Sequence, residues 1–348
     1  MATGRMPVVA WADSGKKRYM KTLKKLTVCL ATAASMAAMA AGPSTAKAVK
    51  TAELAGLVTV APYADLSAKV AAFGMLIGNP VVPALLLASL QQSAVATYGP
   101  FRADKPVILA SYLIAPGKSD EVIIYPSVDR VARTALANPG SERIAKDALH
   151  LMPTDKNPKE RYAVFENNGV FTAFASTEAL ARQGLAEGVP STKDAFPLVR
   201  ISLRQPGVKS VSKAAREHGI TNVYEIVEGF SRLDLTFDMD MHGLSLAFTG
   251  VRANGIADAA YKARFERDLH GVFDMIGGAD SKLSPEIKVS TKPGGMVAGE
   301  IRLTEEQLKG LGKDFNSFVS KQMSGALSGE EEARKKGKKG AKVKERSK

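Results

Sequence analysis

The sequence predicts an α+β fold made of two similar halves, with antiparallel sheets covered by helices on one face. Strand-like runs with alternating apolar residues recur in each half, and helix-like segments with a 3.6-residue apolar spacing lie among them. The run Leu233–Val251 is the clearest antiparallel hairpin, and Asn168-Gly169 marks a second one. The repeated order of elements is compatible with a duplicated ferredoxin-like unit.

In the first half, a strand at Leu57–Ala61 precedes two helices. We expect Asp65 to be the N-cap of the first helix, and the second to run from Pro83 to about Tyr98. The run Val81–Leu90 is apolar on every side but much shorter than the roughly 20 residues that span a bilayer, which predicts a buried helix.

Strand, helix and turn signals then alternate up to residue 186. The predicted elements are strands at Pro106–Ile114 and Glu121–Tyr125, a helix from Ser127 to Ala137, a shorter helix at Glu142–Leu149, a hairpin of Arg161–Glu166 and Val170–Ala175, and a helix capped by Ser176.

The second half repeats this scheme. The predicted elements are a strand at Phe196–Leu203, helices from Pro206 and at Asn222–Glu228, the hairpin Leu233–Val251, a helix from Tyr261 to Ile276, strands at Lys288–Thr291 and Val297–Leu303, and a last helix. Thr304 and Gln307 form a capping-box pair for that helix. Its apolar stripe consists of Leu308, Leu311, Phe315, Phe318 and Met323.

A two-residue turn at His242-Gly243 fixes the predicted register of the main hairpin. The expected partners are Met241 with Leu244, Met239 with Leu246, and Phe237 with Phe248. This register puts every apolar side chain of the hairpin on one buried face and leaves the other face exposed to solvent.

The segment Met20–Ala48 is typical of a secretory signal peptide. Basic residues precede an apolar, alanine-rich run from Leu26 to Ala41, and Ala46-Lys47-Ala48 supplies a cleavage site. The true start is either Met1 or Met20. The apolar run is short for an uncleaved membrane anchor, and Val28 before Cys29 does not fit a lipoprotein. We therefore expect an exported, bacterial protein in the periplasm or outside the cell, without a transmembrane span in the mature chain.

This organisation predicts four parts. They are an N-terminal extension with a cleaved signal peptide (1–48), two α+β domains (49–190 and 191–328) and a disordered basic tail (329–348). The linker-like run Gly188–Thr192 marks the boundary between the domains. Cys29 is the only cysteine, so the mature chain would contain no disulfide.

The net charge of +13 belongs to the two ends of the chain. Residues 1–50 contribute +8 and residues 329–348 contribute +5, so the 30 basic and 30 acidic side chains between them cancel. The tail has too little apolar content to fold alone. Either its lysines hold an anionic envelope polymer or membrane surface, or they serve only solubility. The lysines concerned are Lys335, Lys336, Lys338, Lys339, Lys342 and Lys344. The export signal argues against a nucleic-acid partner.

Asp238, Asp240 and His242 are the strongest catalytic candidates. Strand alternation puts them on one face of the hairpin, where carboxylates and an imidazole could supply acid–base or metal chemistry. Any half-exposed strand has the same pattern, so a solvated face is the alternative. The candidates are weak, and we predict neither a catalytic site nor a metal or cofactor.

Other fragments imitate known motifs without their context. Ser210 and Lys213 match S-x-x-K without the companion motifs, and Ser245 lies in a strand rather than in a nucleophile elbow. Gly277-Gly278 and Gly294-Gly295 are expected to form turns, because neither has the lysine of a phosphate-binding loop.

The segments APYADLSAKVAAFGMLIGNPVVPAL and LDLTFDMDMHGLSLAFTG, with the Met20 signal, are similar to exported proteins of unknown function from planctomycete- and verrucomicrobia-like bacteria. More distantly, the chain resembles the DUF3352 type of exported bacterial protein. The resemblance implies an envelope location and no catalytic residues.

These observations favour an exported, envelope-associated binding or structural protein without catalytic activity. Two alternatives stay open. One is a periplasmic hydrolase whose site is assembled from distant residues, and the other is a carrier of an apolar ligand bound between sheet and helices.

Overall fold

The protein is described from a computed structural model that covers residues 52–115, 118–128, 141–153, 160–166, 170–189, 196–217, 219–240, 242–277 and 284–310. Helices and a large antiparallel sheet are both present in these residues, so the predicted α+β class is confirmed. The predicted signal peptide, most of the helix expected at Ser127–Ala137, and the basic tail lie outside them.

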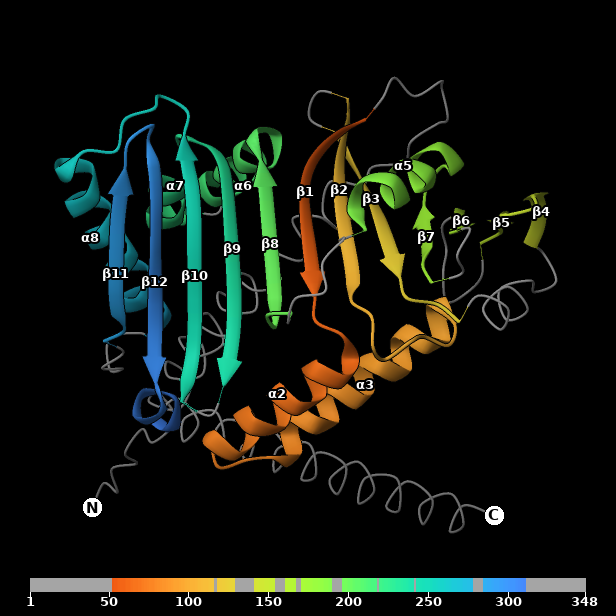
Figure 1. Cartoon of the computed structure of the whole chain (residues 1–348), viewed down its shortest axis with the longest axis horizontal. Helices are drawn as coiled ribbons and strands as arrows, with labels where there is room; N and C mark the ends of the chain where they lie inside the picture. Colours follow the sequence, from red (N-terminus) through yellow and green to blue (C-terminus); the bar gives the residue numbers. More distant parts are fainter. Residues whose placement is uncertain are drawn as a thin grey trace, which may run out of the picture.

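The described strands form one sheet of twelve (Figure 1). They are β1 (Glu53–Val60), β2 (Val107–Ala115), β3 (Lys118–Tyr125), β4 (Ser141–Ala145), β5 (Ala148–Leu151), β6 (Arg161–Phe165), β7 (Thr172–Ala175), β8 (Val199–Arg204), β9 (Phe230–Asp240), β10 (Gly243–Arg252), β11 (Glu286–Lys292) and β12 (Met296–Thr304). Their order is β11-β12-β10-β9-β8-β1-β2-β3-β7-β6-β5-β4, with every named pair antiparallel.

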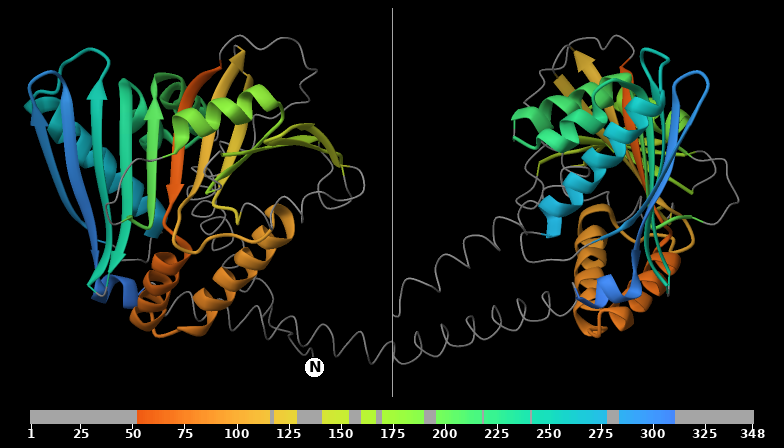
Figure 2. Two further views of the ribbon diagram at one scale, coloured as in Figure 1. Left: turned by 45° about the vertical axis from the view of Figure 1, so that its right-hand side comes forward. Right: turned by 90° about the vertical axis from the view of Figure 1, so that its left-hand side faces the viewer.

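Six named helices lie within the described residues, and residues 305–310 form a further helical segment. The helices are α2 (Tyr63–Leu76), α3 (Val81–Tyr98), α5 (Glu178–Gly188), α6 (Gln205–Glu217), α7 (Thr221–Val227) and α8 (Ala259–Gly277). Helices α6, α7 and α8 accompany the half of the sheet that holds β8–β12, and α5 lies over β2, β3, β6 and β7. Helices α2 and α3 lie across one end of the strands, at the bottom of both views in Figure 2.

The helices of the two halves cover opposite faces of the sheet. In the first half, Gly188 of α5 lies against Leu57 of β1. Leu57 pairs with Ser202 of β8, and Ser202 pairs with Asp234 of β9, so these three side chains share one face. The next residue, Leu233, points to the other face and packs with Phe265 of α8.

The two predicted halves therefore share a single sheet. The predicted boundary near residue 190 falls between α5 and β8, and β8 pairs directly with β1. Helix α3 also reaches the first half, on the face opposite α5, where the ring of Tyr98 lies 5.0 Å from that of Phe174.

The main hairpin is confirmed, but its predicted register is wrong by two residues. Asp240 pairs with Gly243, in place of the predicted pairing of Met241 with Leu244. The observed partners are Met239 with Leu244, Phe237 with Leu246, and Leu235 with Phe248. A shift of two keeps each side chain on its predicted face, and Leu233, Leu235, Leu246 and Phe248 all belong to the apolar cluster beneath α8.

The prediction of a buried helix at Val81–Leu90 is wrong. Helix α3 covers this run, but Val81, Leu85 and Leu90 are 60%, 63% and 67% exposed, and Leu87 is buried. An apolar sequence on all sides cannot say which side meets the core, and only one side of α3 packs on the sheet.

The helix predicted at Glu142–Leu149 is a hairpin of β4 and β5. Strand β5 pairs with β6, with His150 opposite Tyr162. Long-range pairing has overridden the local helical pattern, because β5 extends the sheet beyond β6. The turn carbonyls of Ala145 and Lys146 accept hydrogen bonds from the Arg143 guanidinium at 3.4 and 3.5 Å.

Two predicted helix caps are also wrong. Helix α2 begins after Pro62, which leaves Asp65 in its first turn. The Thr177 hydroxyl, not Ser176, caps α5 by accepting from the Leu180 amide, while the Ser176 hydroxyl donates to Asp120. The Thr304–Gln307 capping box is confirmed, with the Thr304 amide donating to Gln307 Oε1 at 2.9 Å.

Two glycines make room for phenylalanine rings in the second core. A Cβ on Gly299 of β12 would lie 2.4 Å from Phe248 Cζ, and one on Gly250 of β10 would lie 2.4 Å from Phe230 Cε1. Phe248 and Phe230 also contact Phe265 of α8, at ring distances of 5.4 and 6.0 Å. The helix can therefore approach the sheet only where these strands lack side chains.

This packing predicts that Gly299→Ala lowers the free energy of unfolding by about 1–3 kcal/mol, because the new methyl group also meets the Lys288 carbonyl oxygen at 2.3 Å. Urea denaturation of residues 49–348 measures the effect. Gly310→Ala is the matched control, because nothing lies within 4 Å of a Cβ there and alanine favours a helix by roughly 0.8–1 kcal/mol. Equal stability of the two variants would contradict the packing argument.

Candidate functional site

The Asp238 carboxylate accepts hydrogen bonds from α2, from the residue before β8 and from its own strand. Its carboxylate accepts from Lys69 Nζ of α2, from the Met239 amide at 2.9 Å and from the Leu198 amide at 3.3 Å. Lys69 Nζ also donates to the Phe196 carbonyl oxygen at 3.3 Å. These bonds join α2, the start of β8 and the end of β9, and they engage the carboxylate in fastening the helix to the sheet.

Asp240 and His242 contact each other at the β9–β10 turn. The Asp240 carboxylate accepts from the His242 amide at 2.7 Å, which is an Asx-type turn, and lies 3.9 Å from Arg302 Nη2. His242 is exposed. Glu305 has its pKa lowered mainly by Lys309, and His242 contributes a smaller electrostatic share. The hairpin thus brings the three candidates to one end of the sheet, and each carboxylate already serves local structure.

The remaining motif-like fragments have structural partners. The Ser210 hydroxyl on α6 donates to the Pro206 carbonyl at 3.0 Å, and Lys213 lies 3.8 Å from Glu217. Ser245 lies within β10, opposite Asp238. Gly294 and Gly295 have positive φ in the β11–β12 turn, as a turn requires. Gly277 ends α8, and Gly278 lies outside the described residues.

Among the described residues, no group of three or more His, Cys, Asp or Glu side chains is placed to hold a metal ion. His150 stacks on Tyr162 with ring centroids 4.7 Å apart, and its Nε2 lies 3.8 Å from Glu160. None of the helices in this part of the chain is long and apolar enough to cross a membrane. The six tail lysines lie outside it.

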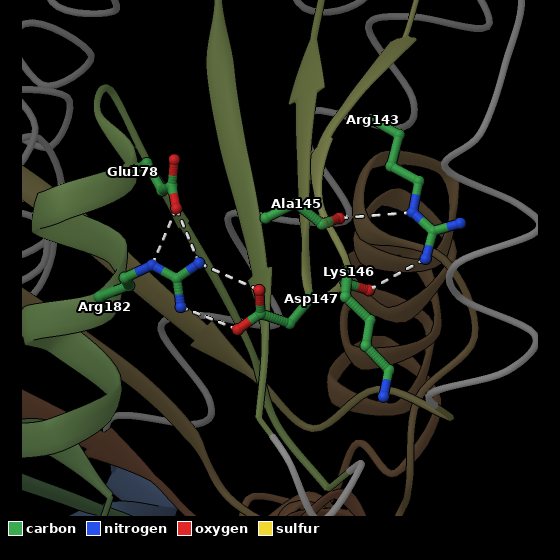
Figure 3. A network of polar contacts seen from close by, with 6 residues as sticks. All are labelled: Arg143, Ala145, Lys146, Asp147, Glu178 and Arg182. Carbon is green, nitrogen blue, oxygen red and sulfur yellow. Dashed lines mark hydrogen bonds and ion pairs between the residues drawn. The ribbon is translucent and has the colours of Figure 1, made fainter.

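Sequence reasoning missed the charge network in Figure 3. Arg182 of α5 donates two hydrogen bonds to Asp147 in the β4–β5 turn, at 2.8 and 3.0 Å, and one to Glu178 at 2.8 Å. These carboxylates raise the pKa of the guanidinium. The i,i+4 spacing of Glu178 and Arg182 could have suggested their pair, but the contact with Asp147 depends on a strand that was predicted to be helical.

A second unpredicted pair lies at the opposite end of the sheet. The Arg252 guanidinium lies 3.9 Å above the ring of Tyr261, which is a cation–π distance. Burial raises the pKa of the Tyr261 hydroxyl, and Arg252 partly offsets this rise. The two residues join the end of β10 to the start of α8, so they support the position of that helix.

The bonds of Asp238 predict a structural role for its carboxylate. We expect Asp238→Ala to lower the free energy of unfolding by about 1–2 kcal/mol, because donors from two other elements lose their acceptor. Asp240→Ala should cost less, since its contacts lie within one turn and with a distant arginine. Urea unfolding of both variants, combined with Lys69→Ala in a double-mutant cycle, tests this order. Unchanged stability of Asp238→Ala would return the residue to the catalytic candidates.

The geometry around Arg182 predicts that lysine cannot replace it. Arg182→Lys removes the two-pronged contact with Asp147 and should destabilise the protein by about 0.5–1 kcal/mol, since the side chain is 42% exposed. Arg143→Lys is the control, because Arg143 makes only long contacts with nearby carbonyls. Thermal or urea unfolding of both variants gives the comparison, and an equal loss in both would contradict the assigned role.

No family model matches the chain, and no curated protein matches it. Three solved structures, crystal forms I, III and IV of TP0453, are similar with TM-scores of 0.39, 0.37 and 0.33. Their identities to this chain are 8%, 11% and 10%. The matches cover 74%, 74% and 76% of this chain and 92%, 93% and 96% of those chains.

Proposed function

We propose that this is an exported, envelope-associated binding or structural protein without catalytic activity, whose basic tail adheres to anionic envelope material. The observation that carries the proposal is the separation of charge along the chain. Residues 51–328 are neutral, while residues 329–348 carry +5. The signal-like segment Met20–Ala48 supports an exported location.

Ion pairing within the body supports the assignment of adhesion to the tail. Basic side chains lie beside acidic ones, either within one element or on neighbouring elements, so their fields largely cancel at a distance. The pairs are Lys69–Asp238, Arg102–Asp104, Arg182–Asp147, Arg232–Asp234, Lys288–Glu286, Arg302–Asp240 and Lys309–Glu305. An anionic polymer or bilayer would therefore be attracted mainly by Lys335, Lys336, Lys338, Lys339, Lys342 and Lys344.

The hydrolase alternative receives less support. A general base or metal ligand needs a free lone pair directed at a substrate or ion. Asp238 accepts from three donors, and Asp240 accepts from the turn amide of His242. The three donors to Asp238 share one oxygen, Oδ1, so that oxygen is committed to holding α2 on the sheet.

The proposal predicts salt-sensitive binding that depends on the tail. Residues 49–348 should co-sediment with native envelope material at low salt, and at least tenfold less in 1 M salt, where the Debye length falls to about 3 Å. A version ending at Ser328 should not bind. A full-length version with the six tail lysines changed to glutamine is the matched control, because it keeps the length of the tail and removes its charge.

The alternatives give different outcomes in the same assay. Equal binding by the version ending at Ser328 would put the binding site on the folded body and contradict a tail-based mechanism. Absence of binding by every version would overturn envelope adhesion altogether.

A further inference from the structure

The end of α2 and one side of α3 carry apolar side chains that do not reach the core. We define the α2–α3 apolar face as Met75, Val81, Leu85 and Val95, which are 68%, 60%, 63% and 37% exposed. On a helix with 3.6 residues per turn, the three residues of α3 lie within one side. Met75 lies at the end of α2, where Gly74 closely approaches Pro80 at the start of α3.

The stretch of sequence that contains this face carries no charged residue. Between Lys69 and Arg102 the chain contains no Asp, Glu, Lys, Arg or His. Exposed helices of soluble domains normally carry charges on the side away from the core. An uncharged, apolar exposed side is therefore suited to an apolar partner.

A segment of the same chain already contacts this end of the protein. The helical residues 305–310 follow β12 and begin at the Thr304–Gln307 capping box. Leu308 in this helix is 3% exposed and forms an apolar cluster with Leu76 of α2 and with Leu303. Leu76 points inward and Met75 outward, but both belong to the last turn of α2, so the last described helix starts near the end of α2 that carries Met75.

The sequence after residue 310 continues the same apolar stripe. Leu311, Phe315 and Phe318 follow Leu308 at intervals of three or four residues. A helix rises about 1.5 Å per residue, so this stripe would extend about 15 Å beyond Leu308. Lys313 and Ser320 fall on the opposite side of such a helix.

We infer that the α2–α3 apolar face is the docking surface for residues 311–323 of the same chain. The Leu308 cluster fixes the origin of this segment next to the face, so binding is intramolecular and needs no external partner. The basic tail then leaves the protein at the α2–α3 end. This inference does not rest on the proposed adhesion, since it concerns the contact and not what the tail binds.

Cysteine pairs test the contact directly. Residues 49–348 contain no cysteine, because Cys29 precedes them. We would combine Leu85→Cys with Leu311→Cys, Phe315→Cys or Phe318→Cys, and measure intramolecular disulfide formation under mild oxidation by mass spectrometry. A disulfide forms readily only when the Cβ atoms approach to about 3.5–4.5 Å. The control combines Leu85→Cys with Ser320→Cys, which has the same separation in sequence as Phe318 to within two residues.

We expect at least one stripe pair to oxidise about tenfold faster than the control. Equal rates for all pairs would overturn the inference, as would disulfides that form only between two copies. A second measurement needs no cysteine. Phe315→Ser with Phe318→Ser should speed hydrogen exchange of α3, whereas Lys313→Ser with Ser320→Ala should not. If neutral phosphatidylcholine vesicles protect α3 equally in both double variants, lipid covers the face and the inference is wrong.

Discussion

The pairing of β1 with β8 is the contact on which the rest of the structure depends. It joins two sets of strands into one sheet, and its register sets Leu57 beside Ser202 and Val58 beside Ile201. The face that carries Leu57 and Ser202 therefore changes from apolar to polar at this junction. The opposite face, which carries Val58 and Ile201, stays apolar across it. Side chains alternate between the two faces, and α5 covers the face that carries Leu57, whereas α6 and α8 cover the face that carries Leu203 and Leu233. A one-residue slip would reverse this relation.

The end of the sheet below β9 and β10 is organised by α2. Lys69 and Asp238 fasten this helix through charge, and Leu76 fastens it through the apolar cluster that includes Leu308. These contacts explain why the best catalytic candidate in the sequence has a structural role. They also place the beginning of the C-terminal segment beside the exposed apolar side of α3. Fold and tail are thus connected at one end of the protein.

The proposed function follows from where charge is balanced and where it is not. Within the described body, acidic and basic side chains pair, as Arg182 does with Asp147 of the β4–β5 turn and with Glu178 of its own helix. Beyond residue 50, the excess positive charge lies in the tail, whose sequence has almost no apolar residues to fold on. Attraction to an anionic surface depends on the number of positive charges more than on their exact placement, and a basic segment provides these charges. Under this proposal, the folded body serves a binding or structural role.

The sequence by itself determined the α+β class, most strands and helices, and the apolar face of the β9–β10 hairpin, because periodicity is local. It also determined the charge layout. Tertiary structure decided the hairpin register, the exposed side of α3 and the strands β4 and β5, as well as the partners of Asp238. Each of these depends on residues distant in the chain. The run Val81–Leu90 is apolar throughout, so its sequence predicts an apolar helix but does not indicate which side of the helix is buried. That side is set by the packing of α3 against the sheet.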